Sequence, residues 1–249
     1  MECLMDKLYI VIPAYNEEEN IENVVNDWYP VVAAHDGKGE SRLLIINDGS
    51  KDSTYEKLKE LAKDRPLMEP VTKPNSGHGA TILYGYGLAI DRGADYIFQT
   101  DSDGQTLPSE FAGFWQNRED YDMVIGSRAG RQDGFSRIVV TKTLKAVIRI
   151  CFGVTVTDAN TPFRLMKAET LKRYIGLIPR DYFLSNVLIS VIYKKKGLKV
   201  KYIPITFRPR QGGVNSINMK RIFNIGRKAF REFREINRTI EKESPGDQI

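Results

Sequence analysis

The sequence of 249 residues predicts one α/β domain, built on a mostly parallel, mixed sheet with helices on both faces. Short apolar runs typical of buried strands alternate with segments typical of helices from residue 8 to about residue 118. Polar motifs stand where the predicted strands end, which is where parallel sheets bind their ligands. No internal repeat or low-complexity linker divides the chain.

Four runs are predicted strands because each is short, apolar and followed by turn or loop residues: 8–12, 42–47, 68–73 and 95–100. Helices are expected over 17–34 and 53–64, after the glycine loop of 75–79 as far as residue 92, and from Pro108 onward. Ser53 and Glu56 have the spacing of a capping box, in which the serine side chain accepts from the first turn.

The composition is ordinary for a soluble globular protein, with 41% hydrophobic and 28% charged residues. Cys3 and Cys151 are the two cysteines, so neither a disulfide framework nor a zinc site is expected, and a reducing compartment is the natural setting. The N-terminus lacks the pattern of a signal peptide, and no run reaches the roughly 18 apolar residues of a membrane span. We therefore expect a cytoplasmic protein, either soluble or peripheral to the cytoplasmic membrane face.

The net charge of +5 is concentrated near the C-terminus. Residues 217–240 hold seven Lys and Arg against two Glu, an excess equal to the charge of the whole chain. That local excess favours one anionic partner over general nucleic-acid binding.

Two segments, 136–152 and 217–240, combine basic residues with apolar residues at helical spacing. Basic amphipathic helices suit an anionic bilayer surface. The alternative is a helix whose apolar stripe faces the protein core and whose charged side is solvated. The sequence leaves both open.

Asp101 and Asp103 are separated by one residue and directly follow a predicted strand. Two such carboxylates can converge on a hard divalent cation, Mn²⁺ or Mg²⁺, which prefers carboxylate and phosphate oxygens. A turn with solvated aspartates is the alternative for this common spacing.

An ordered series of motifs extends the pattern over about residues 7–235. The motifs are IPAYNEE (12–18), NDGSKDS (47–53), NSGHGA (75–80), TDSDG (100–104), GSR (126–128), RQDG (131–134), DANTPFR (158–164) and RQGGVNS (210–216). Together they resemble family 2 glycosyltransferases, which have the Rossmann-like GT-A fold. The resemblance is strongest to the polyprenyl-phosphate sugar synthase branch, which includes dolichol-phosphate mannosyltransferase.

The resemblance implies a GT-A domain over 1–241, with a nucleotide-sugar-binding half (7–120), an acceptor half (121–216), a basic amphipathic helix (217–241) and a flexible tail (242–249). It implies that the nucleotide sugar contacts Pro13, Ala14, Tyr15, Glu17, Asp48, Gly77, Asp101, Ser102 and Asp103. Asp48 would accept a hydrogen bond from the base, since a carboxylate only accepts, although a simple turn aspartate is the alternative. His78 stands where many relatives carry Lys or Arg, so a fixed cation on the diphosphate is not expected there.

By the same resemblance, Asp103 is the main metal ligand, Asp101 shares the ion or contacts the ribose, and Gln105 orients either one. Asp158 lies where the general base of hydroxyl-using relatives is found. A phosphate acceptor would instead need arginines to fix it, since guanidinium binds phosphate bidentately. The candidates are Arg128, Arg131, Arg164, Arg208 and Arg210, with Ser216 in the last motif; a surface salt bridge is the alternative for each arginine.

The sequence thus predicts an inverting, metal-dependent transferase that moves a sugar from a UDP- or GDP-sugar to a polyprenyl phosphate, alone at a membrane surface or beside a membrane partner protein. One alternative is transfer to a saccharide hydroxyl with Asp158 as base. A sugar nucleotidyltransferase ranks lower, because such enzymes carry a Gly-rich basic loop after the first strand. A non-catalytic binding module also ranks low, because Asp101 and Asp103 are both present.

Overall fold

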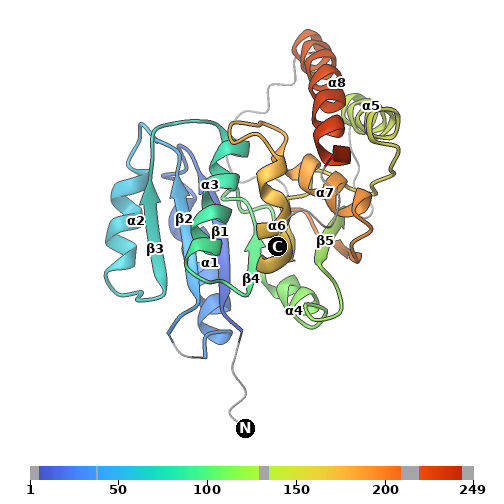
Figure 1. The fold of residues 1–249 in the computed structure, drawn as a ribbon. Helices are drawn as coiled ribbons and strands as arrows, with labels where there is room; N and C mark the ends of the chain where they lie inside the picture. Colours follow the sequence, from blue (N-terminus) through green and yellow to red (C-terminus); the bar gives the residue numbers. More distant parts are fainter. Residues whose placement is uncertain (1–5, 38, 129–134, 209–218, 243–249) are drawn as a thin grey trace.

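Seven strands form one mixed sheet in the computed structural model, which describes residues 6–37, 39–128, 135–208 and 219–242 (Figure 1). They are β1 (Leu8–Ala14), β2 (Arg42–Asn47), β3 (Met68–Thr72), β4 (Tyr96–Gln99), β5 (Met123–Arg128), β6 (Arg164–Lys167) and β7 (Val200–Ile205). Their order is β3-β2-β1-β4-β6-β5-β7. Neighbours are parallel except where β6 meets β4 and β5. The mostly parallel sheet is confirmed.

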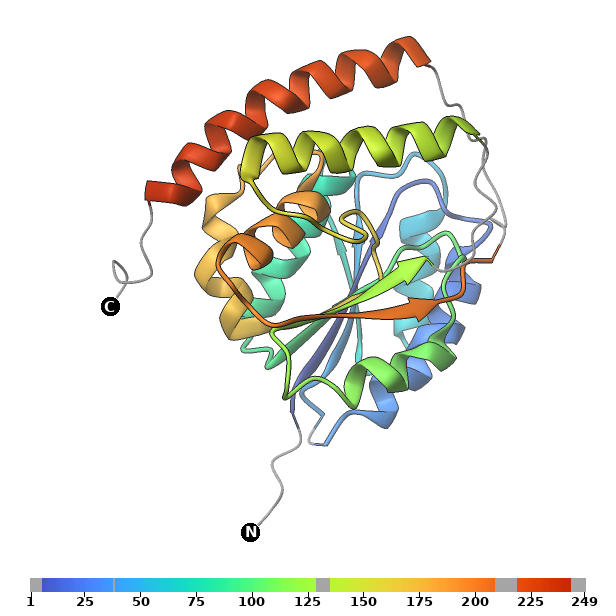
Figure 2. The ribbon, with the colours of Figure 1, turned by 90° about the vertical axis from the view of Figure 1, so that its right-hand side faces the viewer.

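Helices cover both faces of this sheet (Figures 1 and 2). They are α1 (Ile21–Ala34), α2 (Thr54–Ala62), α3 (His78–Asp91), α4 (Phe111–Trp115), α5 (Phe135–Phe152), α6 (Ala168–Tyr174), α7 (Ser185–Lys195) and α8 (Met219–Lys242), with 3₁₀ turns η1 (Pro108–Glu110) and η2 (Ile175–Leu177). Because both faces are covered, every residue of β1 is buried. Tyr9 and Val11 join the core with α3 and α7, whereas Leu8, Ile10 and Ile12 join the core with α1 and α4, as the two-residue period of a strand requires.

The predicted capping box at α2 is wrong. The Ser53 side chain makes no cap hydrogen bond. Asp52 Oδ1 takes that part, accepting from Thr54 N at 3.0 Å, while Glu18 Oε2 accepts from Ser53 N at 3.0 Å. Asp52 therefore replaces the serine cap, and the Glu18 contact ties the loop that follows β1 to the start of α2.

The helix pair α5 and α8 lies side by side at one end of the molecule (Figure 2). Phe152 of α5 and Phe233 of α8 have ring centroids 5.1 Å apart. Phe233, Ile236 and Ile240 are buried, so in the described side chains of α8 the apolar stripe faces the core, as the alternative interpretation of an amphipathic helix requires. The predicted C-terminal amphipathic helix is confirmed. Among the described residues, no helix combines the length and the apolar character that crossing a bilayer demands.

Candidate functional site

A cavity of about 470 Å³ opens at the carboxyl ends of the central strands. The three segments that leave β1, β2 and β4 meet there because those strands are parallel neighbours. Its lining residues are Pro13, Ala14, Tyr15, Glu17, Asp48, Asn75, Gly77, His78, Thr81, Asp101, Ser102 and Asp103. All nine residues expected to contact a nucleotide sugar are in this lining. The volume is in the range of small-molecule sites.

Asn75, His78 and Thr81 line the cavity but were not among the expected contacts. The glycine loop between β3 and α3 was a signal for close backbone approach, and Gly77 has a φ of +87° that suits glycine. Thr81 lies one turn into α3, where its hydroxyl donates to Gly77 O at 2.9 Å. The spacing of four residues from Gly77 could have indicated Thr81, because positions i and i+4 share a helix face.

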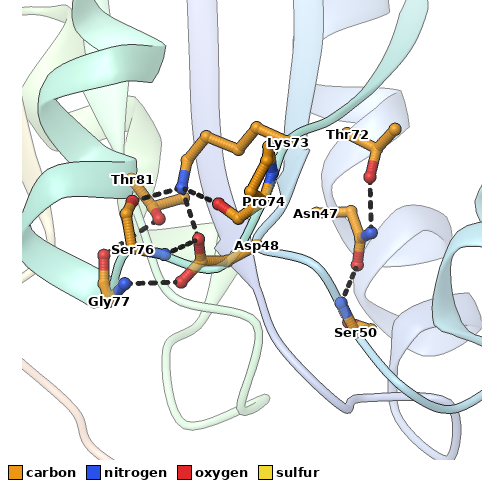
Figure 3. A network of polar contacts seen from close by, with 9 residues as sticks. All are labelled: Asn47, Asp48, Ser50, Thr72, Lys73, Pro74, Ser76, Gly77 and Thr81. Atoms are coloured by element: carbon orange, nitrogen blue, oxygen red, sulfur yellow. Dashed lines mark hydrogen bonds and ion pairs between the residues drawn. The ribbon is translucent and has the colours of Figure 1, made fainter.

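Asp48 is the centre of a polar network on the cavity wall (Figure 3). Its Oδ1 accepts from Lys73 Nζ and from Ser76 N at 2.9 Å, and its Oδ2 accepts from Gly77 N at 2.9 Å. Burial acts to raise the pKa of Asp48, but the hydrogen bonds from Lys73, Ser76 and Thr81 outweigh it, so that the pKa lies below its usual range. Asp48 is therefore an ionised carboxylate that fixes the loop between β3 and α3.

Asp101 and Asp103 lie in the loop that follows β4. Among the described residues Asp101 Oδ1 is a buried atom with no hydrogen-bond partner, and His78 Nε2 lies 3.7 Å from it. Asp103 Oδ1 accepts from Gln105 N at 3.1 Å. An unpartnered buried carboxylate oxygen is costly by itself, and a divalent cation would satisfy it. The residues present therefore fit Mn²⁺ or Mg²⁺.

Such a cation would need further ligands besides the two carboxylates. Within the described ranges, no three His, Cys, Asp or Glu side chains gather where one ion could bind them. Two carboxylates, with water and substrate phosphate oxygens completing the shell, are the usual arrangement for Mg²⁺ bound together with a nucleotide.

Gln105 and Arg208, which are distant in the sequence, are joined by two hydrogen bonds. Arg208 N donates to Gln105 O at 2.8 Å, and Gln105 Nε2 donates to Arg208 O at 3.0 Å. These two hydrogen bonds join the acidic loop, residues 101–105 after β4, to the segment that leaves β7. The Gln105 backbone thus contacts Asp103, while its side chain contacts Arg208.

Arg164 does not lie where a phosphate ligand must lie. It is fully buried at the start of β6, and its guanidinium donates to Thr161 O at 3.0 Å and to Asn186 O at 3.0 Å. Burial, its largest influence, lowers the pKa of Arg164, with Tyr86 and Asp158 acting in the opposite direction. The expectation that an arginine in an apolar strand needs partners is met by backbone carbonyls. Its expected role at the acceptor phosphate is therefore revised to a structural one.

The other acceptor-side candidates divide into two groups. Asp158 is half-buried before β6 and is not in the cavity lining, and Arg208 is exposed at the end of β7. Arg131, Arg210, Ser216 and the side chain of Arg128 lie outside the described residues.

Gly79 fixes how closely α3 approaches the segment before α7. A Cβ at this position would lie 2.2 Å from Tyr182 O and 2.9 Å from Phe183 Cα, and both are backbone atoms. Gly79→Ala is therefore expected to lower the free energy of unfolding by about 1–3 kcal/mol, because the neighbouring backbone must move. Urea unfolding followed by circular dichroism measures this.

Gly87→Ala is the matched control on the same helix. A Cβ there meets nothing within 4 Å, so alanine should raise the free energy of unfolding by about 0.5–1 kcal/mol. Equal effects of the two substitutions would contradict the close approach at Gly79.

Solved structures of similar shape show that the fold is GT-A. Glucosyl-3-phosphoglycerate synthase from Mycobacterium tuberculosis, solved with Mn²⁺ and UDP-glucose, matches with a TM-score of 0.65 at 18% identity, over 97% of this chain and 81% of that chain. The same synthase with phosphoglyceric acid matches with a TM-score of 0.65 over 97% of this chain and 82% of that chain.

The chain belongs to glycosyl transferase family 2, whose family model matches residues 9–175. It is therefore a glycosyltransferase, as the motifs predicted. A UDP-N-acetylglucosamine–dolichyl-phosphate N-acetylglucosaminyltransferase of Methanococcus voltae is 28% identical, over 81% of this chain and 86% of the relative. A polyprenol monophosphomannose synthase of Mycolicibacterium smegmatis is 27% identical, over 84% of this chain and 80% of the relative.

Proposed function

We propose that this glycosyltransferase moves a sugar from a nucleoside-diphosphate sugar to a polyprenyl phosphate, with inversion and with Mn²⁺ or Mg²⁺ held by Asp101 and Asp103. The observation that carries the proposal is the buried Asp101 oxygen, which has no hydrogen-bond partner among the described residues and lies in the cavity that Asp103 and the nucleotide-sugar motifs line. The relatives named above support the acceptor, as does an undecaprenyl-phosphate mannosyltransferase of Micrococcus luteus that is 24% identical.

The donor half of the site would hold the nucleotide against the strand ends. Asp48 is already ionised and would accept an N–H of the base, while Gly77 leaves the backbone open to the donor. A bound divalent cation would act as a Lewis acid for the departing diphosphate. Asp101 and Asp103 would fix its place, and the Gln105 N–H would hold the Asp103 carboxylate in position.

The acceptor oxygen would attack the anomeric carbon from the side opposite the diphosphate, which inverts the configuration. A phosphate acceptor is already largely ionised near neutral pH, because its second pKa is about 6, so no strong general base is needed. The place of Asp158 outside the cavity lining supports this acceptor over a saccharide hydroxyl. Arg208, exposed beside the acidic loop, is the described arginine best placed to attract the phosphate.

The helix pair α5 and α8 would bring the protein to the cytoplasmic face of a membrane. Both helices expose basic side chains among their described residues: Lys142, Lys145, Arg149, Arg231, Arg234 and Arg238. Ile150 of α5 is 70% exposed. Basic charge is attracted to anionic lipid, and an exposed apolar side chain adds burial at the headgroup boundary.

The direct test is sugar transfer with the purified protein, Mn²⁺, labelled UDP- and GDP-sugars and a short polyprenyl phosphate. We expect a lipid-linked sugar of inverted anomeric configuration, and its loss when EDTA removes the cation. Product on a saccharide hydroxyl alone would support the alternative acceptor. Release of pyrophosphate from a nucleoside triphosphate and a sugar phosphate would indicate a nucleotidyltransferase. The absence of lipid-linked product with every donor would refute the proposal.

A further inference from the structure

Asn16 has a left-handed backbone conformation between two residues of the cavity lining. Its φ is +54°, and within the described ranges it is the one residue other than glycine with a positive φ. Asparagine adopts this conformation more readily than most other L residues. Tyr15 and Glu17, its neighbours in the chain, both line the cavity, whereas Asn16 does not. We therefore expect Asn16 to act on a ligand through the backbone that carries Tyr15 and Glu17.

Two hydrogen bonds to the loop that follows β2 hold Asn16 in this conformation. Asn16 N donates to Ser50 Oγ at 2.9 Å, and Lys51 N donates to Asn16 Oδ1 at 2.9 Å. The backbone and the side chain of Asn16 are thus both bonded to that loop. Its φ cannot leave the left-handed region without disturbing these bonds.

The two residues after Asn16 are bonded to the same part of the chain. Glu17 N donates to Thr54 Oγ1 at 2.9 Å, and Glu18 N donates to Asp52 Oδ2 at 3.2 Å. The Glu17 side chain is held as well, because Asn20 Nδ2 donates to Glu17 Oε2 at 3.0 Å. Three consecutive N–H groups of the loop after β1 therefore bind side chains that follow β2, and Asn16 is the first of the three.

We infer that Asn16 is a positioning residue, whose left-handed backbone sets Tyr15 and Glu17 in place for the nucleoside part of the donor. The cation and the diphosphate would instead lie at Asp101 and Asp103, in the loop that follows a different strand, β4. Asn16 should therefore govern binding of the nucleoside and leave binding of the diphosphate unaffected. The inference rests on the proposed function, because it assumes that a nucleoside diphosphate sugar occupies this cavity.

Asn16→Ala tests the inference, because alanine lacks the Oδ1 acceptor and is disfavoured in the left-handed region by about tenfold or more. Only the fraction of the variant that keeps the conformation is ready to bind. UDP and GDP are both titrated by calorimetry with Mn²⁺, and the tighter ligand is used. We expect its Kd to rise about tenfold. Pyrophosphate with Mn²⁺ has no nucleoside, so its inhibition constant as a competitor of that ligand should not change.

Asn16→Gly is the rescue variant, since glycine adopts a positive φ without strain. It loses only the acceptor for Lys51 N, so its Kd should stay within about threefold of the wild-type value. Asn26→Ala is the matched control, at an exposed position on α1 where the side chain accepts from Arg65. It should leave both constants unchanged.

A folded Asn16→Ala protein with the wild-type Kd would overturn the inference and leave the proposed function standing. Equal losses for the nucleotide and pyrophosphate, or equal losses in the alanine and glycine variants, would do the same. If Asn16→Ala does not fold, Ser50→Ala removes the acceptor of Asn16 N and should raise the nucleotide Kd about threefold; no rise would refute the role of Asn16. A wild-type protein that binds neither UDP nor GDP, or from which pyrophosphate displaces neither, would overturn the proposed function itself.

Discussion

Asp103→Asn is expected to reduce sugar transfer by about 10³-fold while the protein remains folded. The amide keeps an oxygen that can accept from Gln105 N, so the turn after β4 is preserved. It loses the negative charge that would hold the cation against the leaving diphosphate. Stabilisation of transition-state charge by a metal is worth several kcal/mol, and each 1.4 kcal/mol is about a factor of ten in rate.

Initial rates at saturating donor and Mn²⁺ measure this loss, with circular dichroism as the check on folding. Asp64→Asn, at an exposed aspartate two residues after α2, is the control and should keep the wild-type rate. An Asp103→Asn protein with full activity would remove the metal assignment and, with it, the proposed chemistry.

Arg164→Met is expected to lower the free energy of unfolding by about 3 kcal/mol or more. The guanidinium is the donor to the carbonyls of Thr161 and Asn186, and the whole side chain is inaccessible to solvent. Methionine fills much of the volume but donates nothing, so each buried carbonyl that loses its donor costs about 1–3 kcal/mol. The loss should appear as a lower urea midpoint.

Arg173→Met on α6 is the control for this substitution, because that side chain is 61% exposed and its nearest acid is 3.9 Å away. Exposed ion pairs of this kind contribute little. If Arg164→Met kept the stability of the wild type but raised the KM for the lipid phosphate, the original assignment of Arg164 to the acceptor would be restored.

The strands could be predicted because their signal is local. The interval 42–47 is the observed β2, and the predicted 95–100 differs from β4 by one residue at each end. The capping box was wrong because Asp52 replaces the Ser53 side chain at the helix start, and because Ser53 N donates to Glu18, which is distant in the sequence, and not to Glu56. No local pattern contains the information that Glu18 will lie beside Ser53.

The residues of the cavity lining could be predicted where they belong to recognisable sequence motifs. The pairing of Asp48 with Lys73 could not, because 25 residues separate them and a lysine after a strand is ordinary. Arg164 shows the same limit. Its strand position indicated a buried group that needs partners, but whether those partners are ligand phosphates or protein carbonyls depends on the packing of α7, which supplies Asn186.

The direction of β6 has a consequence for the rim of the site. In the antiparallel pairs that it forms, Arg164 stands opposite Gln99 of β4 and opposite Ile125 of β5. The first residue of β6 is therefore level with Gln99, the last residue of β4, and the chain that enters β6 does so at the edge where the chain leaves β4. Because β6 is the one reversed strand in an otherwise parallel sheet, the loop that enters β6 and carries Asp158 lies at the same edge of the sheet as the loop that leaves β4 and carries Asp101.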